Sequence, residues 1–320
     1  MATFTIEPER STLHGVFSQD FAPVLTVDPG DSVVYRTLDA AWALEPHRAD
    51  GTLRRKFEPR EPARDNGHAL RGPVAIRGAE PGMTLAVRID ELCPEPWGWT
   101  VAGGCDTAFN RRLGVVEGDL LPRWAIDVER GVCRDQFGRE IGLRPFMGVM
   151  GMPGTGAEPE PSWTPRSQGG NIDCKELIAG STLFLPIAVP GGLFSTGDGH
   201  AAQGDGEVSG TAVECPMERV VLTFDLLPDL HLTMPRALTP AGWITFGFHE
   251  DLHEATMIAL EATVEWIEGL YGLNRHHAVA LASLAVDLRV TQIVNLGVMG
   301  VHAVLPNGAL RFAQGLGGQS

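Results

Sequence analysis

The sequence predicts a mainly β protein with an α+β C-terminal part. Its 39 glycines and 23 prolines separate short apolar runs along most of the chain, which is typical of sandwiches and barrels. A helical spacing of apolar residues begins only at Asp251. We therefore expect a β-sandwich, a second β-rich or barrel-like unit and a small helix-containing portion.

Two N-terminal segments, 24–35 and 74–89, each indicate a strand, a turn and a second strand. Both turns contain a Pro-Gly dipeptide, at Pro29-Gly30 and Pro81-Gly82, which favours a chain reversal. We expect two hairpins of one N-terminal sandwich. The charged, poorly periodic residues 47–71 between them indicate a long connection or a border of the active site.

Residues 148–170 are rich in proline and glycine and cannot hold a regular element for long. This stretch predicts a domain boundary. We expect an N-terminal β-sandwich-like domain of residues 1–150 and a metal-bearing β-rich domain of residues 151–320 that includes the α+β portion. In the second domain, the apolar and β-branched run 181–189 predicts a buried strand.

The C-terminal part changes to a helical pattern. Apolar residues recur at helical spacing from Asp251 until Gly272, which predicts an amphipathic helix. Asn274 is a suitable N-cap for a second helix, and residues 288–294 return to a strand-like pattern.

The composition excludes several classes of partner. The formal net charge is −15 and the pI is about 5.1, so neither a nucleic acid nor an anionic membrane is an expected partner. No apolar run approaches the ~20 residues that cross a bilayer, and the N-terminus lacks the basic start and apolar stretch of a signal peptide. The five cysteines are scattered and odd in number, which favours a reduced, cytoplasmic protein.

The segment 197–207 has the composition of a functional site. Its acids and its histidine stand among glycines and alanines, which cannot build a core. Glycine permits positive φ and a close approach to a ligand, so we expect Asp198, His200, Asp205 and Glu207 to converge from one compact loop. The alternative is a pair of tight turns with solvated carboxylates.

A second polar cluster, Gly169-Gly170-Asn171-Ile172-Asp173, precedes the predicted strand 181–189. Mixed imidazole and carboxylate ligands suit zinc, manganese or iron better than magnesium. We predict Asp173 and His200 as metal ligands with a catalytic role, and Glu207 as the general base or a further ligand.

Three other residues complete the predicted metal site. Asp198 and Asp205 are expected to orient the imidazole or support the loop, and His68 is a candidate for another ligand or an acid. The same acids also permit an additional, structural calcium site, because carboxylate and carbonyl oxygens are hard donors.

The order of these motifs resembles the acetamidase/formamidase family, in which a Gly-Gly-Asn-x-Asp turn, a strand and a Gly-Asp-Gly-His-Ala-Ala-Gln-Gly-Asp-Gly-Glu segment follow one another. In this chain the motifs occupy 169–173 and 197–207. The resemblance extends over the whole chain, through residues 66–68, 72–74, 96–100, 144–148 and 287–295.

The resemblance implies a metal-dependent amidohydrolase, with zinc as the expected metal. Its substrates would be short aliphatic amides such as formamide and acetamide, and its products a carboxylate and ammonia. It also implies a homo-oligomer, for which a homodimer is the default symmetric choice.

Three alternatives remain open or are disfavoured by the residues. The same fold could hydrolyse another C–N bond, in a cyclic or N-substituted amide. The chain could instead be a non-catalytic β-sandwich that binds a small ligand and is stabilised by calcium. Thiol catalysis by Cys174, Lys175 and Glu176 is disfavoured, because consecutive residues on an extended chain point to opposite faces.

Overall fold

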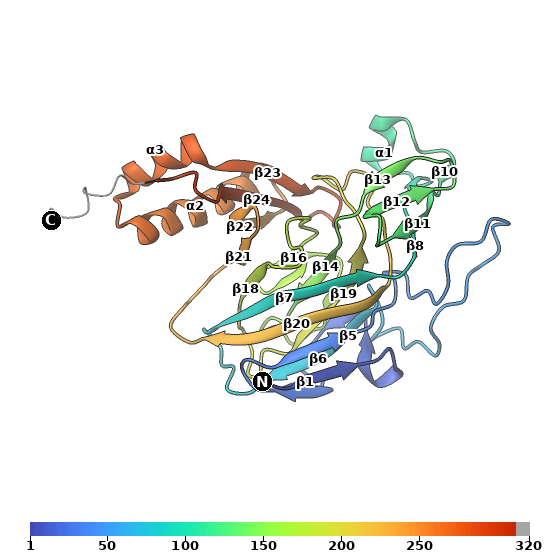
Figure 1. The fold of residues 1–320 in the computed structure, drawn as a ribbon, viewed down its shortest axis with the longest axis horizontal. Coiled ribbons are helices and arrows are strands. Elements are labelled where there is room, and N and C mark those ends of the chain that lie inside the picture. The colour runs from blue at the N-terminus through green and yellow to red at the C-terminus, as the bar shows by residue number, and fades with distance from the viewer. Residues whose placement is uncertain (312–320) are drawn as a thin grey trace.

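Two large sheets pack face to face and hold the main apolar core between them (Figure 1). The computed structural model describes residues 1–311, so residues 312–320 of the second predicted domain lie outside the described residues. Phe224 and Leu85 of one sheet and Phe194 and Val74 of the other belong to this core. The predicted fold class, mainly β with a helical C-terminal part, is confirmed.

The larger sheet has nine strands and is antiparallel except for its first pair. In spatial order its strands are β1 (Thr3–Ile6), β5 (Ser32–Tyr35), β20 (Met217–Leu227), β7 (Thr84–Pro94), β18 (Thr182–Pro186), β21 (Arg236–Thr239), β22 (Gly242–His249), β24 (Met299–Pro306) and β23 (Asp287–Gln292).

The second sheet has seven strands and carries the site. Its strands are β16 (Pro165–Arg166), β17 (Gly169–Asn171), β14 (Phe146–Gly151), β19 (Phe194–His200), β6 (Leu70–Ile76) and β2 (Leu13–His14), with β4 (Leu25–Val27) parallel to β6.

Smaller elements surround the sandwich. A four-stranded sheet contains β13 (Glu140–Gly142), β12 (Val132–Asp135), β11 (Arg123–Asp127) and β8 (Trp97–Trp99). The remaining short elements are η1 (Arg10–Thr12), β3 (Val16–Phe17), β9 (Ala102–Gly103), α1 (Ala108–Leu113), β10 (Asp119–Leu120) and β15 (Glu160–Pro161). All these sheets are open, and no closed barrel is present among residues 1–311.

The two predicted N-terminal hairpins are wrong, although their strands exist. β4 and β6 belong to the seven-stranded sheet, whereas β5 and β7 belong to the nine-stranded sheet. The connecting residues 28–31 and 77–83 are longer than the two-residue turns of tight hairpins, and they carry the chain from one layer to the other. The Pro-Gly turns therefore join the two sheets of the sandwich.

Strands from both sides of residue 150 share each large sheet. β7 lies between β18 and β20, and β14 lies beside β19. The predicted division at residue 150 stays a prediction about domains, while the hydrogen-bonded core is continuous across it.

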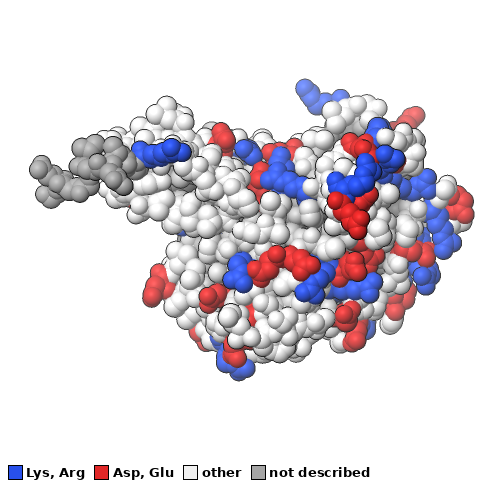
Figure 2. Space-filling model, viewed as in Figure 1, with Lys and Arg blue, Asp and Glu red and all other residues white. Residues whose placement is uncertain are grey.

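Charged side chains on the face seen in Figure 2 are interspersed in sign. On β7 and β20 they form pairs, such as Arg88 with Asp90 and Arg219 with Glu91. This face of the described residues shows no continuous basic patch. Within residues 1–311, no helix has the length and apolar character needed to cross a membrane.

The predicted helices are confirmed as α2 (Leu252–Tyr271) and α3 (Arg275–Ala285). The Asp251 side chain accepts hydrogen bonds from the first-turn backbone of α2, and Gly272 ends the helix in the left-handed conformation. α2 packs on β22 and β24 through small residues, including Ala255 and Ala259. Gly247 of β22 faces these alanines, so a side chain there would meet the helix backbone.

We expect Gly247→Ala to lower the free energy of unfolding by roughly 1–3 kcal/mol, because the added methyl group would contact the rigid backbone of α2. Gly269→Ala is the matched control, since Gly269 lies on an exposed part of the same helix with open space around it. That control should raise stability by roughly 0.5–1 kcal/mol. Urea denaturation of both variants measures the difference; equal midpoints would contradict the close packing of α2 on β22.

Candidate functional site

Strand β19 positions Asp198 and His200 at the centre of the seven-stranded sheet. The two residues are separated by one position, so their side chains lie on the same face of the strand, and both are buried. Glycines occupy the alternate positions because a Cβ at Gly197 would lie 2.5 Å from the oxygen of Ala69, and one at Gly199 would lie 2.7 Å from the oxygen of Cys215. The expectation of a single compact loop is therefore wrong, since residues 197–200 of this segment belong to a buried strand.

Asp173 reaches the site from the turn that follows β17. Its backbone has a φ of 52°, and its N–H donates to the oxygen of Gly148. The Gln203 amide donates to the Asp173 backbone oxygen at 2.7 Å, and the Asn295 amide donates to Asp173 Oδ2 at 2.6 Å. Residues distant in sequence thus fix both the backbone and the carboxylate of Asp173.

Gly148 of β14 leaves the space that these side chains occupy. A Cβ at this position would lie 2.5 Å from Asp198 Oδ2, 2.6 Å from Asp173 Oδ1 and 2.9 Å from His200 Cε1. Any larger residue would displace the carboxylates, so the close grouping of Asp173, Asp198 and His200 depends on this glycine.

Glu207 lies in the turn after β19, and the end of β23 holds that turn in place. The N–H of Gly206 donates to the oxygen of Thr291 at 3.0 Å, and the N–H of Ile293 donates to the oxygen of Gly206 at 3.2 Å. Glu207 has a φ of 46° and is buried. Its Oε2 has no hydrogen-bond partner within the described part of the chain.

Glu214 is a site residue that the sequence analysis missed. Its backbone pairs with Trp99 on one side and His200 on the other, which brings its Oε2 to 3.3 Å from His200 Nε2. The signal in the sequence is weak: Glu214 is a lone acid within the otherwise uncharged run 211–216. Glu214 reaches the site only through its backbone pairing with Trp99 and His200, and no local sequence motif predicts that pairing.

The electrostatics of the site come from carboxylates that surround one imidazole. His200 Nε2 lies 3.3 Å from Asp198 Oδ1 as well as from Glu214, and His200 Nδ1 lies 3.9 Å from Asp173 Oδ1. Burial opposes a charge on His200, but the carboxylates of Glu214 and Asp198 raise its pKa well above the usual value.

The carboxylates themselves are shifted in different directions. Burial raises the pKa of Asp173 and of Glu214 to about 7, and it raises the pKa of Glu207 well above its usual value. Burial also disfavours ionised Asp198, yet the adjacent His200 and the more distant His68 lower its pKa below the usual range. With His200 as the only positive group among them, the four buried carboxylic acids are therefore not all ionised at neutral pH unless a further cation binds.

The donor atoms of this cluster fit a divalent metal. Asp173 Oδ1, His200 Nδ1, Glu207 Oε2 and Glu214 Oε2 are buried and have no hydrogen-bond partner among residues 1–311. Two overlapping sets have their ligand atoms within 4.8 Å of one another. They are Asp173, Asp198 and His200, and His200, Glu207 and Glu214. Nitrogen and oxygen donors in such a set suit zinc or a related transition metal.

Two predicted metal residues lie outside these sets. The Asp205 carboxylate forms an ion pair with Lys175 at 2.9 Å and is partly exposed. The His68 side chain lines the neighbouring cavity, where its Nδ1 lies 3.3 Å from Ser162 Oγ. A metal role for either residue stays a prediction.

Cys174, the nucleophile of the disfavoured thiol alternative, is fully buried in the main apolar core. Burial raises the pKa of its thiol to about 12. A thiol in this environment stays protonated at neutral pH and is a poor nucleophile.

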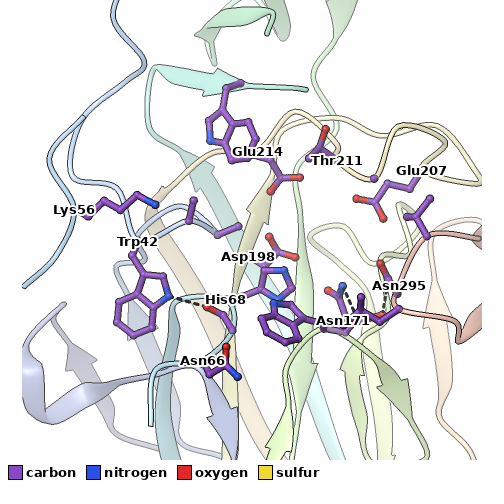
Figure 3. A pocket seen from close by; sticks show the side chains of 18 of the residues that line it. Trp42, Lys56, Asn66, His68, Asn171, Asp198, Glu207, Thr211, Glu214 and Asn295 are labelled. Carbon is purple, nitrogen blue, oxygen red and sulfur yellow. Dashed lines mark hydrogen bonds between the residues drawn. The ribbon is translucent and has the colours of Figure 1, made fainter. Parts of the chain in front are cut away.

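A cavity of about 530 Å³ opens over the cluster (Figure 3). Asp198, Glu207 and Glu214 line its inner end, and the figure shows their carboxylates directed toward one another. The other walls are contributed by the segment 40–68, by Trp99, Trp163 and Asn171, by residues 210–211 and by residues 294–296. The charged connection 47–71 therefore borders the cavity, as expected. The arrangement brings three buried acids to the floor of an accessible pocket, and the His200 imidazole contacts two of them.

Relatives of this chain are known as amidases. A putative formamidase from Schizosaccharomyces pombe is 26% identical over 253 residues, which are 63% of this chain and 60% of the relative. An acetamidase from Mycolicibacterium smegmatis is 29% identical over 203 residues, or 44% of this chain and 49% of the relative. The matched part of this chain thus spans less than two thirds of either relative's length.

A solved structure supports the same relationship. The acetamidase from Bacillus halodurans has a TM-score of 0.80 and 25% identity, and the match covers 94% of this chain and 97% of that one. A model of the acetamidase/formamidase family matches residues 3–160 and 155–312. This match spans nearly the whole sequence, and the chain belongs to the acetamidase/formamidase family.

Proposed function

We propose that this protein hydrolyses short linear amides, such as formamide and acetamide, to a carboxylate and ammonia, and that it requires a divalent metal, first of all zinc. The observation that carries the proposal is the set of buried donor atoms without partners on Asp173, His200, Glu207 and Glu214. Glu207 and Glu214 line the floor of the cavity, and His200 is grouped with them. Membership of the family supports the amide as the substrate class.

His200 belongs to both candidate ligand sets, which gives it the central place in this proposal. Asp173 and Asp198 would complete one set, and Glu207 and Glu214 the other. A bound divalent metal would supply a Lewis acid that polarises the amide carbonyl and makes a water more acidic.

The chain itself supplies the proton transfers. We assign Glu207 as general base because its carboxylate lines the cavity and forms no ion pair among residues 1–311. As the water oxygen bonds to the carbonyl carbon, a water proton passes to Glu207; the resulting acid then protonates the amide nitrogen as the C–N bond breaks. Amide and water are thereby converted to carboxylic acid and ammonia.

We also propose a cellular compartment and an oligomeric state for this protein. All five cysteines are free, and Cys133, Cys174 and Cys215 are buried, which supports a reducing, cytoplasmic environment. A homodimer is the assembly that we propose from the family resemblance.

We expect His200→Ala to reduce the rate of ammonia release from formamide, acetamide and propionamide by about 10²–10⁴-fold, because it removes the residue common to both ligand sets. Mass spectrometry of the purified variant should find that the metal is lost as well. His253→Ala is the control, since His253 is an exposed histidine on α2, away from the cavity.

The metal content and amide turnover of the wild-type protein distinguish the metal-amidase proposal from the alternatives. Turnover with a bound transition metal supports the metal-amidase proposal. A full transition-metal complement without turnover of these amides would favour another C–N substrate, whereas tightly bound calcium without turnover would favour the binding module.

We expect Gly148→Ala to reduce kcat/KM by about 10²-fold and to lower the metal content, because its methyl group would push apart Asp173 and Asp198. Gly142→Ala is the matched control, as Gly142 lies on a strand with open space beside it. Ammonia release, metal content and circular dichroism should be measured for both. Normal activity of folded Gly148→Ala protein would rule out the close carboxylate grouping as a requirement.

A further inference from the structure

The cavity is larger than the amides named above require. At about 530 Å³ it lies within the ~300–1,000 Å³ typical of pockets for drug-sized ligands, whereas formamide and acetamide contain very few atoms. Its inner end holds the acids of the proposed catalytic cluster. Trp42 and Lys56 form the outer wall on the side of the cavity opposite that cluster, and so small a substrate would not reach it.

This outer wall has a fixed backbone. Ala43 and Lys56 form an antiparallel bridge, which two further hydrogen bonds flank. They run from Leu44 N–H to the Arg55 oxygen at 3.0 Å and from Phe57 N–H to the Trp42 oxygen at 2.9 Å. Backbone hydrogen bonds between residues 42–44 and residues 55–57 therefore fix the position of the Lys56 backbone beside the cavity.

Lys56 is the cation of this wall that has no protein partner. Arg54 pairs with Asp39 at 2.5 Å, Arg55 pairs with Glu45 at 2.9 Å, and Arg60 donates to the Asp65 oxygen. Lys56, in contrast, forms no hydrogen bond or ion pair within the described residues, and Figure 3 shows its ammonium directed across the cavity. The outer end of the cavity therefore offers a positive charge to a ligand.

One indole ring of the cavity wall offers apolar surface. Trp99 is partly exposed, whereas Trp42 is fully buried and has the Arg60 guanidinium 4.3 Å from its ring centroid. Trp42 donates its Nε1–H to the Gly67 oxygen at 2.8 Å, and Trp99 donates its Nε1–H to Asp39 Oδ2 at 2.9 Å. Both polar edges are thus already paired, and what remains for a ligand is the exposed part of the Trp99 ring. Hydrocarbon placed there would leave water with a favourable free energy.

We infer that the preferred substrates are amides whose acyl chain ends in a carboxylate, the monoamides of dicarboxylic acids, and that Lys56 binds this distal carboxylate. The inference rests on the proposed amide hydrolysis and specifies its substrate class. Because Lys56 lies on the side of the cavity opposite Asp198, Glu207 and Glu214, the carboxylate must be separated from the amide by several methylene groups to reach it. Glutaramate, with three methylene groups, meets this requirement, and oxamate, with none, does not.

The test compares glutaramate with butyramide, a neutral amide of similar acyl length. In the wild type, kcat/KM should be higher for glutaramate. Lys56→Met should lower kcat/KM for glutaramate by about three- to tenfold and affect butyramide far less, as expected for loss of one partly solvated charge contact. Added salt should reduce the wild-type preference.

Arg55→Met is the matched control, because it removes a positive charge from the neighbouring position without altering the cavity wall. It should leave the preference for glutaramate intact. A wild-type preference for butyramide would overturn the inference, as would equal losses in Lys56→Met and Arg55→Met, which would indicate a general charge effect.

Binding separates this inference from the proposed function. The dissociation constant of glutarate, measured by titration calorimetry, should rise several-fold in Lys56→Met and stay unchanged in Arg55→Met. If no amide is hydrolysed but glutarate binding depends on Lys56, the hydrolytic function fails and the anion subsite stands. If amides are hydrolysed but Lys56 affects neither glutaramate nor glutarate, the subsite fails and the hydrolytic function stands.

Discussion

The burial of several carboxylates around a single imidazole is the constraint on which the rest of this structure depends. Ionised groups lose much solvation free energy when they leave water, so a buried acid requires a proton, a hydrogen-bond donor or a cation. His200 and the Asn295 amide provide only part of the hydrogen bonds and positive charge that the buried acids require. These acids are Asp173, Asp198, Glu207 and Glu214. Asp173, Asp198 and Glu207 also have positive φ, an unfavourable conformation that the surrounding structure must maintain.

The sandwich holds these residues in place through contacts with distant parts of the chain. The central strand β19 carries Asp198 and His200, and Gly148 on the adjacent β14 leaves them room. The end of β23, near the C-terminus, fixes the turn of Glu207 and leads to Asn295. Because these donor atoms come from a sheet interior and from turns bonded to it, their relative positions are set by the core. Rigid support of this kind is what a metal or catalytic site needs.

The sequence predicted residue types better than their placement. Asp198, His200 and Glu207 were predicted because they stand among glycines and alanines, which cannot build a core, and Asp173 because it ends a second polar cluster. The structure groups the three acids of this set around His200. The sequence also grouped Asp205 with them, whereas that carboxylate pairs with Lys175. Glu214 was missed because only its contact with β19 and β8 brings it to His200. The hairpins failed for a similar reason: a Pro-Gly turn specifies a reversal and not the sheet in which the next strand lies.

The two ends of the cavity also differ in charge, and this difference orients a ligand. Carboxylates lie at the inner end and the Lys56 ammonium lies at the outer end. A molecule with a neutral amide at one end and a carboxylate at the other gains from the field in one orientation and is repelled in the reverse orientation. In our proposal, a divalent metal at the floor would offset these acids and bind the neutral amide, and Lys56 would bind the carboxylate at the other end. The proposed substrate preference and the proposed metal therefore rest on the same arrangement of charged side chains.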